Sequence, residues 1–245
     1  MKVPAADQRV MLEVAEVDAD LAKVRHQRAH LPEEQEIADL ERKLADARDD
    51  AVRADIAAED LDREYKRLDT EITGMRTREE HDSELLGQTG MAAKALSELQ
   101  HEVAGLARRR SVAEDELLEL MERQEATAEE KSRAETAVAD LTADVERVTA
   151  RRDAAAAELD AKLADLDQRR AAVVAEAPAE LLTIYTRLTD HGKVGAGLLR
   201  QRRCGACSME LDRGTVAQIA AADDDEVIRC EECGALLIRT HESGL

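Results

Sequence analysis

The sequence predicts a mostly α protein: a long antiparallel coiled-coil helical hairpin followed by a small C-terminal C4 zinc ribbon. Through most of residues 5–176, apolar residues recur alternately three and four positions apart, which is the period of a coiled-coil seam. A pair of glycines interrupts this pattern near its middle. Two CxxC pairs follow near the C-terminus. We therefore expect a hairpin over 1–177, a short helix and glycine-rich hinge over 178–197, and a ribbon over 198–245.

The composition is typical of solvated helices. Charged residues make up 37% of the chain and aromatic residues only 1%, a mix that also occurs in disordered proteins. The regular spacing of the apolar 44% argues for helices instead. The net charge of −20 lies mostly in the predicted hairpin, so its surface should repel phosphate. It either keeps the helices solvated or attracts a basic partner.

The N-terminus and the hydropathy favour a cytoplasmic location. No basic segment followed by an apolar stretch opens the chain, and no apolar run is long enough to span a membrane, so we expect no membrane partner. In a reducing cytosol, two CxxC pairs suit a metal site better than disulfides.

The first arm of the predicted hairpin carries two seams. One runs from Val10 to Val24 and the other from Ile37 to Met75. Their phases differ by one residue, and Pro32 lies between them. Because proline lacks the helical N–H and disfavours helix in the residue before it, we expect a break at Leu31–Pro32.

A third seam, from Leu96 to Val173, forms the second arm, and it includes polar positions such as Lys162 and Arg169. The turn is predicted near 86–91, where two glycines lie three residues apart. A turn centred near residue 87.5, where facing residue numbers sum to about 175, would bring three pairs together: Leu21 with Ala155, Ile37 with Val138, and Met75 with Leu99. The alternative is a parallel dimer of uninterrupted helices, which would not need the glycines. A dimer of hairpins also stays open.

After Pro178, the segment 179–190 has the apolar face of a short helix. Three glycines in 191–197 then predict a hinge or turn. This stretch fits neither GxxxxGK[ST] nor GxGxxG, so we expect no phosphate loop.

Four cysteines with the spacing of a zinc ribbon follow, namely Cys204, Cys207, Cys230 and Cys233. Each CxxC turn presents two thiolates to one metal, and two turns complete a tetrahedral shell. Because such a shell has no open position, we expect one structural Zn²⁺. Strands are predicted over 198–203, 226–229 and 236–240, with a helix over 212–222 capped by Asp212. Redox-active pairs are the alternative, but the strand–helix–strand context of a thioredoxin site is absent.

Three arginines beside the first CxxC pair, Arg200, Arg202 and Arg203, form a candidate phosphate-binding patch. Alternatively, their positive charge balances the negative charge of the thiolates and of nearby carboxylates. No aromatic side chain in the ribbon offers a stacking surface for bases. The six histidines show no metal-ligand spacing, and no nucleophile–base arrangement predicts an enzyme or a small-molecule substrate.

The chain resembles a bacterial family of C4-type zinc ribbon proteins with an N-terminal coiled-coil hairpin, which includes flagellar and type III secretion-associated members. The resemblance is carried by GMAAKALSELQHEV and EDELLELME at 90–103 and 114–122, and by CGAC and IRCEECGALLI in the ribbon. It implies a protein without enzymatic activity that binds protein partners, among them secretion components and a sigma factor, or RNA. Ala235 stands where the family commonly has a basic residue, which weakens the nucleic-acid interpretation.

Two functions therefore remain open. The first is a non-enzymatic interaction protein, acting as scaffold, adaptor or chaperone for protein partners. The second is a protein that binds RNA or DNA through its zinc ribbon.

Overall fold

The computed structural model describes residues 1–88 and 90–244. The chain divides into two compact units, residues 1–34 with 151–245 and residues 35–150. Thr89, within the predicted turn, and Leu245, at the end of the predicted ribbon, lie outside the described residues.

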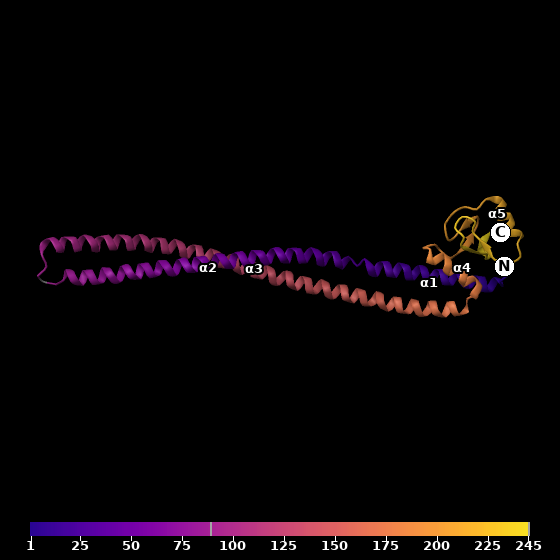
Figure 1. Ribbon diagram of the computed structural model, residues 1–245, viewed down its shortest axis with the longest axis horizontal. Coiled ribbons are helices and arrows are strands. Elements are labelled where there is room, and N and C mark those ends of the chain that lie inside the picture. The colour runs from indigo at the N-terminus through magenta and orange to yellow at the C-terminus, as the bar shows by residue number, and fades with distance from the viewer. Residues whose placement is uncertain (89, 245) are drawn as a thin grey trace. The chain divides into compact units, whose positions relative to one another are not determined.

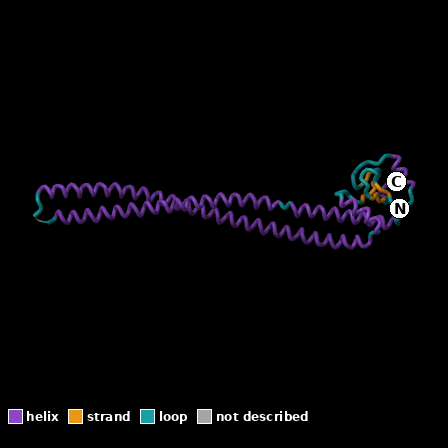
Figure 2. The backbone as a smooth tube through the Cα atoms, viewed as in Figure 1, coloured by secondary structure: helices purple, strands orange, loops and turns teal. Residues whose placement is uncertain are grey.

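Three helices, α1 (Ala5–Ala29), α2 (Pro32–Leu86) and α3 (Ala93–Glu176), form the long helical hairpin over residues 5–176 (Figures 1 and 2). Pro32 is the first residue of α2, a position where its missing N–H has no helical partner to lose. None of the described helices is long and apolar enough to cross a membrane.

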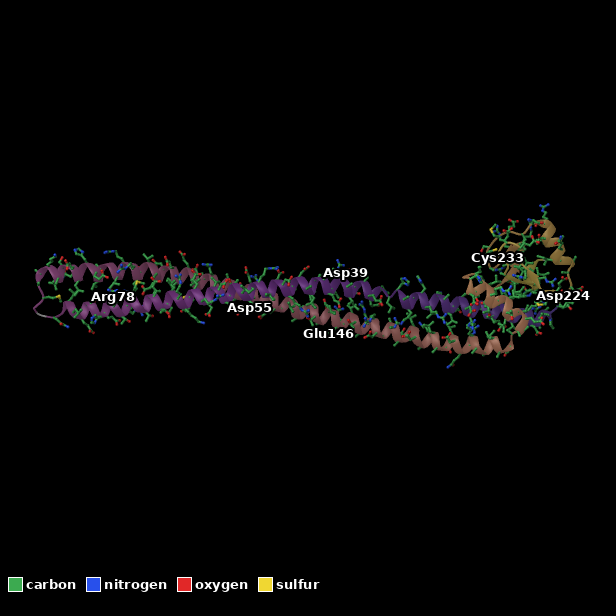
Figure 3. The ribbon with its side chains drawn as sticks, viewed as in Figure 1. Asp39, Asp55, Arg78, Glu146, Asp224 and Cys233 are labelled. Atoms are coloured by element: carbon green, nitrogen blue, oxygen red, sulfur yellow. The ribbon has the colours of Figure 1, made fainter. Side chains whose placement is uncertain are left out.

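Within residues 35–150, the predicted seams supply the contact between α2 and α3. The buried residues of both arms all fall on predicted seam positions: Leu44, Ala47, Leu61, Leu68 and Ile72 on α2, and Leu106, Ala113, Leu120 and Val148 on α3. Charged side chains such as Asp39, Arg78 and Glu146 lie along the rest of the helical surface (Figure 3). This division is what the heptad pattern predicts.

The predicted register between the two arms is wrong. Arg110 of α3 donates to Glu79 of α2 at 2.9 Å, whereas the predicted turn centre would place it opposite Tyr65. Met75 packs with Leu68, Ile72, Ala113 and Leu117 instead of lying near Leu99. The segment between α2 and α3 is centred about two residues beyond the predicted turn centre, which accounts for only part of the difference between Tyr65 and Glu79. The heptad period fixes the face of each helix but not how far one slides along the other.

Within the other unit, the third seam changes phase near the end of α3. Lys162 and Arg169, predicted in the seam, are exposed, and Leu163 and Arg170 are partly buried in their place. The predicted alternation of three and four therefore fails here. A step of four after Leu159 keeps an apolar residue, Leu163, on the inner face.

The C-terminal region adds helix α4 (Ala179–Asp190), helix α5 (Arg213–Ala221), the 3-10 helix η1 (His241–Ser243) and a four-stranded sheet. The strands are β1 (Ala196–Arg200), β2 (Arg203–Cys204), β3 (Ile228–Arg229) and β4 (Leu236–Ile238), in the order β2-β1-β4-β3. β1 pairs with β4 in parallel, and the outer pairings are antiparallel.

Two details of the predicted ribbon need correction. The single strand predicted over 198–203 is a tight hairpin of β1 and β2, because Gln201 has φ 49° and turns the chain. The glycine-rich segment 191–197 turns at Gly192 and then enters β1. An added Cβ at Gly195 would lie 2.3 Å from Cδ2 of Tyr185, so this glycine lets the backbone lie directly on the aromatic ring.

The N-terminus also belongs to the ribbon, which the sequence does not indicate. The N–H of Val3 donates to the carbonyl of Asp225 at 2.7 Å, and that of Val227 donates to the carbonyl of Met1 at 3.1 Å. Lys2 forms an ion pair with Asp223 at 2.7 Å.

One hydrophobic core joins α1, α4 and the sheet within the same unit. Its buried members come from five segments: Val3, Met11, Val14, Leu181, Tyr185, Ala196, Leu236 and Ile238. The ribbon is therefore packed on helices and supported by more than its metal site.

Candidate metal centre

The first cysteine knuckle follows β2. The N–H of Ser208 donates to the carbonyl of Cys204 at 2.8 Å, and the N–H of Cys204 donates to the carbonyl of Met209 at 3.0 Å. Ser208 adopts a left-handed conformation with φ 63°. This tight turn places the side chains of Cys204 and Cys207 on the same side of the backbone.

The second knuckle repeats this backbone pattern. Gly234 donates to the carbonyl of Cys230 at 2.9 Å, and Cys230 donates to the carbonyl of Ala235 at 2.9 Å. Gly234 has φ 78° and occupies the position that Ser208 has in the first knuckle. Local hydrogen bonds thus form both turns in the same way.

Close backbone approach holds the first knuckle against β1. The N–H of Gly205 donates to the carbonyl of Leu198 at 2.9 Å. A Cβ at Gly205 would lie 2.6 Å from that carbonyl oxygen, and a Cβ at Gly197 would lie 2.4 Å from the nitrogen of Ala206. Both glycines are needed because a side chain would push the knuckle off the strand.

The four predicted ligands converge. Their sulfur atoms all lie within 4.8 Å of one another. The Sγ atoms of Cys204 and Cys233 are 3.9 Å apart, and those of Cys207 and Cys230 are also 3.9 Å apart. A tetrahedral Zn²⁺ with Zn–S bonds of about 2.3 Å requires sulfur atoms about 3.8 Å apart. The donor set and its spacing therefore fit a structural zinc with four protein ligands.

Burial and backbone N–H groups shape the protonation of these thiols. Burial raises the pKa of Cys204 to about 12, against the N–H groups of Cys207 and Ala206 that favour the thiolate. Burial likewise raises the pKa of Cys233. The N–H of Met209 lowers the pKa of Cys207 by bonding to its thiolate. Because a metal binds thiolates, loading this site releases protons and weakens as the pH falls.

Apolar side chains surround the cysteines. Cys204 and Cys230 are buried in a cluster with Leu199, Leu211, Ile219 and Leu237, to which β1, α5 and β4 contribute. Asp212 accepts from the N–H groups of Gly214 and Thr215, which caps α5 as predicted. These N–H groups and the Thr215 hydroxyl lower the pKa of the Asp212 carboxyl.

The three arginines of the candidate phosphate patch are exposed at the turn between β1 and β2, and each faces a carboxylate. Arg200 lies 3.6 Å from Glu242, Arg202 lies 3.0 Å from Glu210, and Arg203 lies 3.9 Å from Glu210. Part of their charge is therefore balanced within the ribbon.

The sequence did not indicate a polar network beneath the ribbon. The hydroxyl of Tyr185 on α4 donates to Asp18 of α1 at 2.8 Å, and Arg170 of α3 donates to the same carboxylate. Burial, and then the neighbouring Asp18, raises the pKa of Tyr185. The polar positions in the predicted seam of α3 indicated a buried polar side chain here, but the predicted phase placed Arg169 in the seam instead of Arg170.

Two family models match the chain, one over the helical hairpin and one over the ribbon. Residues 14–193 match the family described as a CT398-like coiled coil hairpin domain. Residues 203–237 match the family described as a C4-type zinc ribbon domain, and this match includes all four cysteines.

The chain is similar over nearly its whole length to mycobacterial proteins. Rv2229c of Mycobacterium tuberculosis, described as an uncharacterized protein, is 39% identical over 239 residues, which cover 98% of both chains. ML1638 of Mycobacterium leprae, described in the same way, is 32% identical over 226 residues, covering 91% of this chain and 96% of the relative.

Solved structures share the fold. A Mycobacterium smegmatis protein superposes with a TM-score of 0.85 at 38% identity, covering 98% of this chain and all of the other. CT398 from Chlamydia trachomatis superposes with a TM-score of 0.64 at 15% identity, covering 96% of this chain and 98% of the other. At that identity the second likeness shows the fold alone.

Proposed function

The chain belongs to the CT398-like coiled-coil hairpin family, and we propose that it is a non-enzymatic scaffold or adaptor for protein partners. In this proposal one structural zinc holds the ribbon, and the helical hairpin offers the binding surface. The ribbon packs on α1 and α4, so its fold also fixes the base of these helices.

The geometry of the four sulfur atoms supports a structural role for the metal. A zinc with four thiolate ligands has no coordination position for water or substrate, unlike catalytic zinc with three protein ligands. Cys204 and Cys230 are also buried, and Cys207 and Cys233 are partly buried.

The observation that carries the proposal is the exposed helical surface. Over residues 35–150, α2 and α3 direct their seam residues at each other and leave long charged faces, on which several large apolar side chains are exposed. Neighbouring exposed apolar side chains at helical spacing, such as Leu118 with Met121, are typical of a helix face that packs against another helix.

Affinity capture from a lysate of the native cells tests this function. One half of the lysate is treated with nuclease before capture. We expect the full-length protein to retain specific partners equally in both halves. Recovery of no protein above the background of an unrelated acidic coiled coil would reject the proposal.

RNA or DNA binding by the ribbon is the second candidate. It is favoured by three exposed arginines at one turn and disfavoured by their carboxylate neighbours. Binding through these arginines should weaken steeply with salt and on replacing all three by alanine. A gel shift at low salt measures this, and no shift for either nucleic acid rejects it.

A further inference from the structure

We propose that a basic amphipathic helix of a partner protein docks on the outer face of α3, over Leu118 and Met121. The proposal rests on the scaffold function above and names the surface and the partner class. Within residues 117–121, two apolar side chains face the hairpin core and two are exposed. Leu117 packs against the α2–α3 core and Leu120 is 3% exposed, whereas Leu118 is 60% and Met121 is 42% exposed. The hairpin core therefore does not use these two side chains.

Leu118 and Met121 share one face of the helix, because residues three apart lie on neighbouring turns. With Glu114 and Glu125 they form a row spaced four, three and four residues apart. This is the spacing with which one helix receives the apolar residues of another. The row is therefore suited to a helix and offers less to an extended peptide, which would read alternate residues.

The charge around this row defines the partner. From Glu114 to Glu130 the sequence has eight carboxylates and a single basic residue, Arg123. Glu114 is already bonded to Arg110 and Arg76. In the part of the chain that the structure describes, the other carboxylates that flank the row form no ion pair: Asp115, Glu119, Glu122 and Glu125. A partner that covers Leu118 and Met121 must therefore bring lysine or arginine beside its apolar face.

The same charge argues against other occupants. Nucleic acid would be repelled by the carboxylates. A second copy using this face symmetrically would bring two acidic rows together, which is unfavourable for like charges. A basic helix instead gains contact with the two apolar side chains and with the unpaired carboxylates.

A synthetic helical peptide provides the test. The probe is a fluorescent peptide with leucines at heptad spacing and lysines on both flanks, and its anisotropy is measured against the full-length zinc-loaded protein at low and high salt. We expect binding that weakens with salt. The double variant Leu118→Ala/Met121→Ala should bind at least roughly tenfold more weakly, and Glu122→Gln/Glu125→Gln should reduce the salt dependence.

Val52→Ala/Ile56→Ala is the matched control. These side chains are 58% and 54% exposed on α2, four residues apart. The residues three or four positions from them include two arginines, Arg48 and Arg53, beside four carboxylates, of which Asp55 and Asp60 already form ion pairs. This face is therefore less acidic than the row on α3. The control should bind the peptide like the unmodified protein. Helicity by circular dichroism should be unchanged in all variants, since none removes a core residue.

Three outcomes would overturn the proposal: equal losses in the test and control variants, no preference over a peptide with glutamate in place of lysine, or a dimer that Leu118→Ala/Met121→Ala dissociates. If the lysate capture still recovers specific partners with this double variant, the docking face is rejected and the scaffold function stands. If capture fails for the unmodified protein, the scaffold function itself fails.

Discussion

Ser208 and Gly234 occupy equivalent positions in the two knuckles, and both have a left-handed backbone. An L-residue with a side chain is strained there by about 1–2 kcal/mol. Replacing Ser208 by glycine removes this strain but makes the unfolded chain more flexible. We therefore expect Ser208→Gly to raise the free energy of unfolding by up to about 1 kcal/mol.

Gly234→Ala is the opposite change in the second knuckle. It should lower the free energy of unfolding by about 1–2 kcal/mol. Denaturant titration of the zinc-loaded proteins compares the two variants. Equal effects of the same sign would contradict the equivalence of the knuckles.

Tyr185 is 2% exposed, and its hydroxyl donates to the carboxylate of Asp18. Tyr185→Phe keeps the packing but removes a hydrogen bond to a charged group, so it should lower the free energy of unfolding by about 1.5–3 kcal/mol. Denaturant unfolding measures this, and Tyr65→Phe on α2 is the control. An equal effect of both changes would show that the bond to Asp18 contributes nothing.

Alkaline pH offers a second test of the same contact. The pKa of Tyr185 is raised by burial and by Asp18, so the neutral form is favoured in the folded state. Its stabilising contribution is complete below the unfolded pKa of about 10 and is lost as the pH rises above that value. The stability difference between the unmodified protein and Tyr185→Phe should therefore shrink at high pH. A constant difference would contradict this assignment.

At the scale of elements, the sequence predicted the buried face of α2 and of α3 as far as Leu159, but not how the arms align. Heptad spacing identifies the seam because burial follows the helical period. Sliding one arm by whole heptads, each about two turns long, preserves that seam, so only particular polar pairs select the register. Glu79 with Arg110 and Asp55 with Lys131 are such pairs. The sequence does not indicate which charged residue of one arm pairs with which residue of the other.

A photo-crosslink distinguishes the two registers. A benzophenone amino acid in place of Ile72 should crosslink to α3 near Ala113 and Leu117, which pack in the same cluster. The register predicted from the glycines would instead give crosslinks near Val103. Mass spectrometry of the digested protein identifies the site, and crosslinks centred on Val103 would contradict the structure.

At the scale of the whole molecule, the metal site could be predicted from the sequence, whereas two contacts between distant segments could not. Two CxxC pairs specify a tetrathiolate site by spacing alone, and the structure brings those four sulfur atoms together. The addition of Met1–Val3 to the ribbon could not be predicted, because it depends on backbone hydrogen bonds that any side chain allows. The Asp18–Arg170–Tyr185 network joins three helices and likewise has no local signal.

Zinc removal should unfold the ribbon and leave most of the helical hairpin folded. Chelation leaves four thiols that no longer hold the knuckles together, whereas α2 and the part of α3 within residues 35–150 lie in a separate compact unit. We expect the helical circular dichroism to remain largely intact while the ribbon becomes sensitive to protease. Loss of most helicity on chelation would contradict this view.

Four thiolates that fill the coordination shell leave the metal a purely structural role. X-ray absorption at the zinc edge of the purified full-length protein measures this shell. We expect one zinc per chain with four sulfur neighbours at about 2.3 Å and no lighter neighbour. An oxygen or nitrogen neighbour in the first coordination shell would contradict it, because it would reveal an open position at which chemistry can occur.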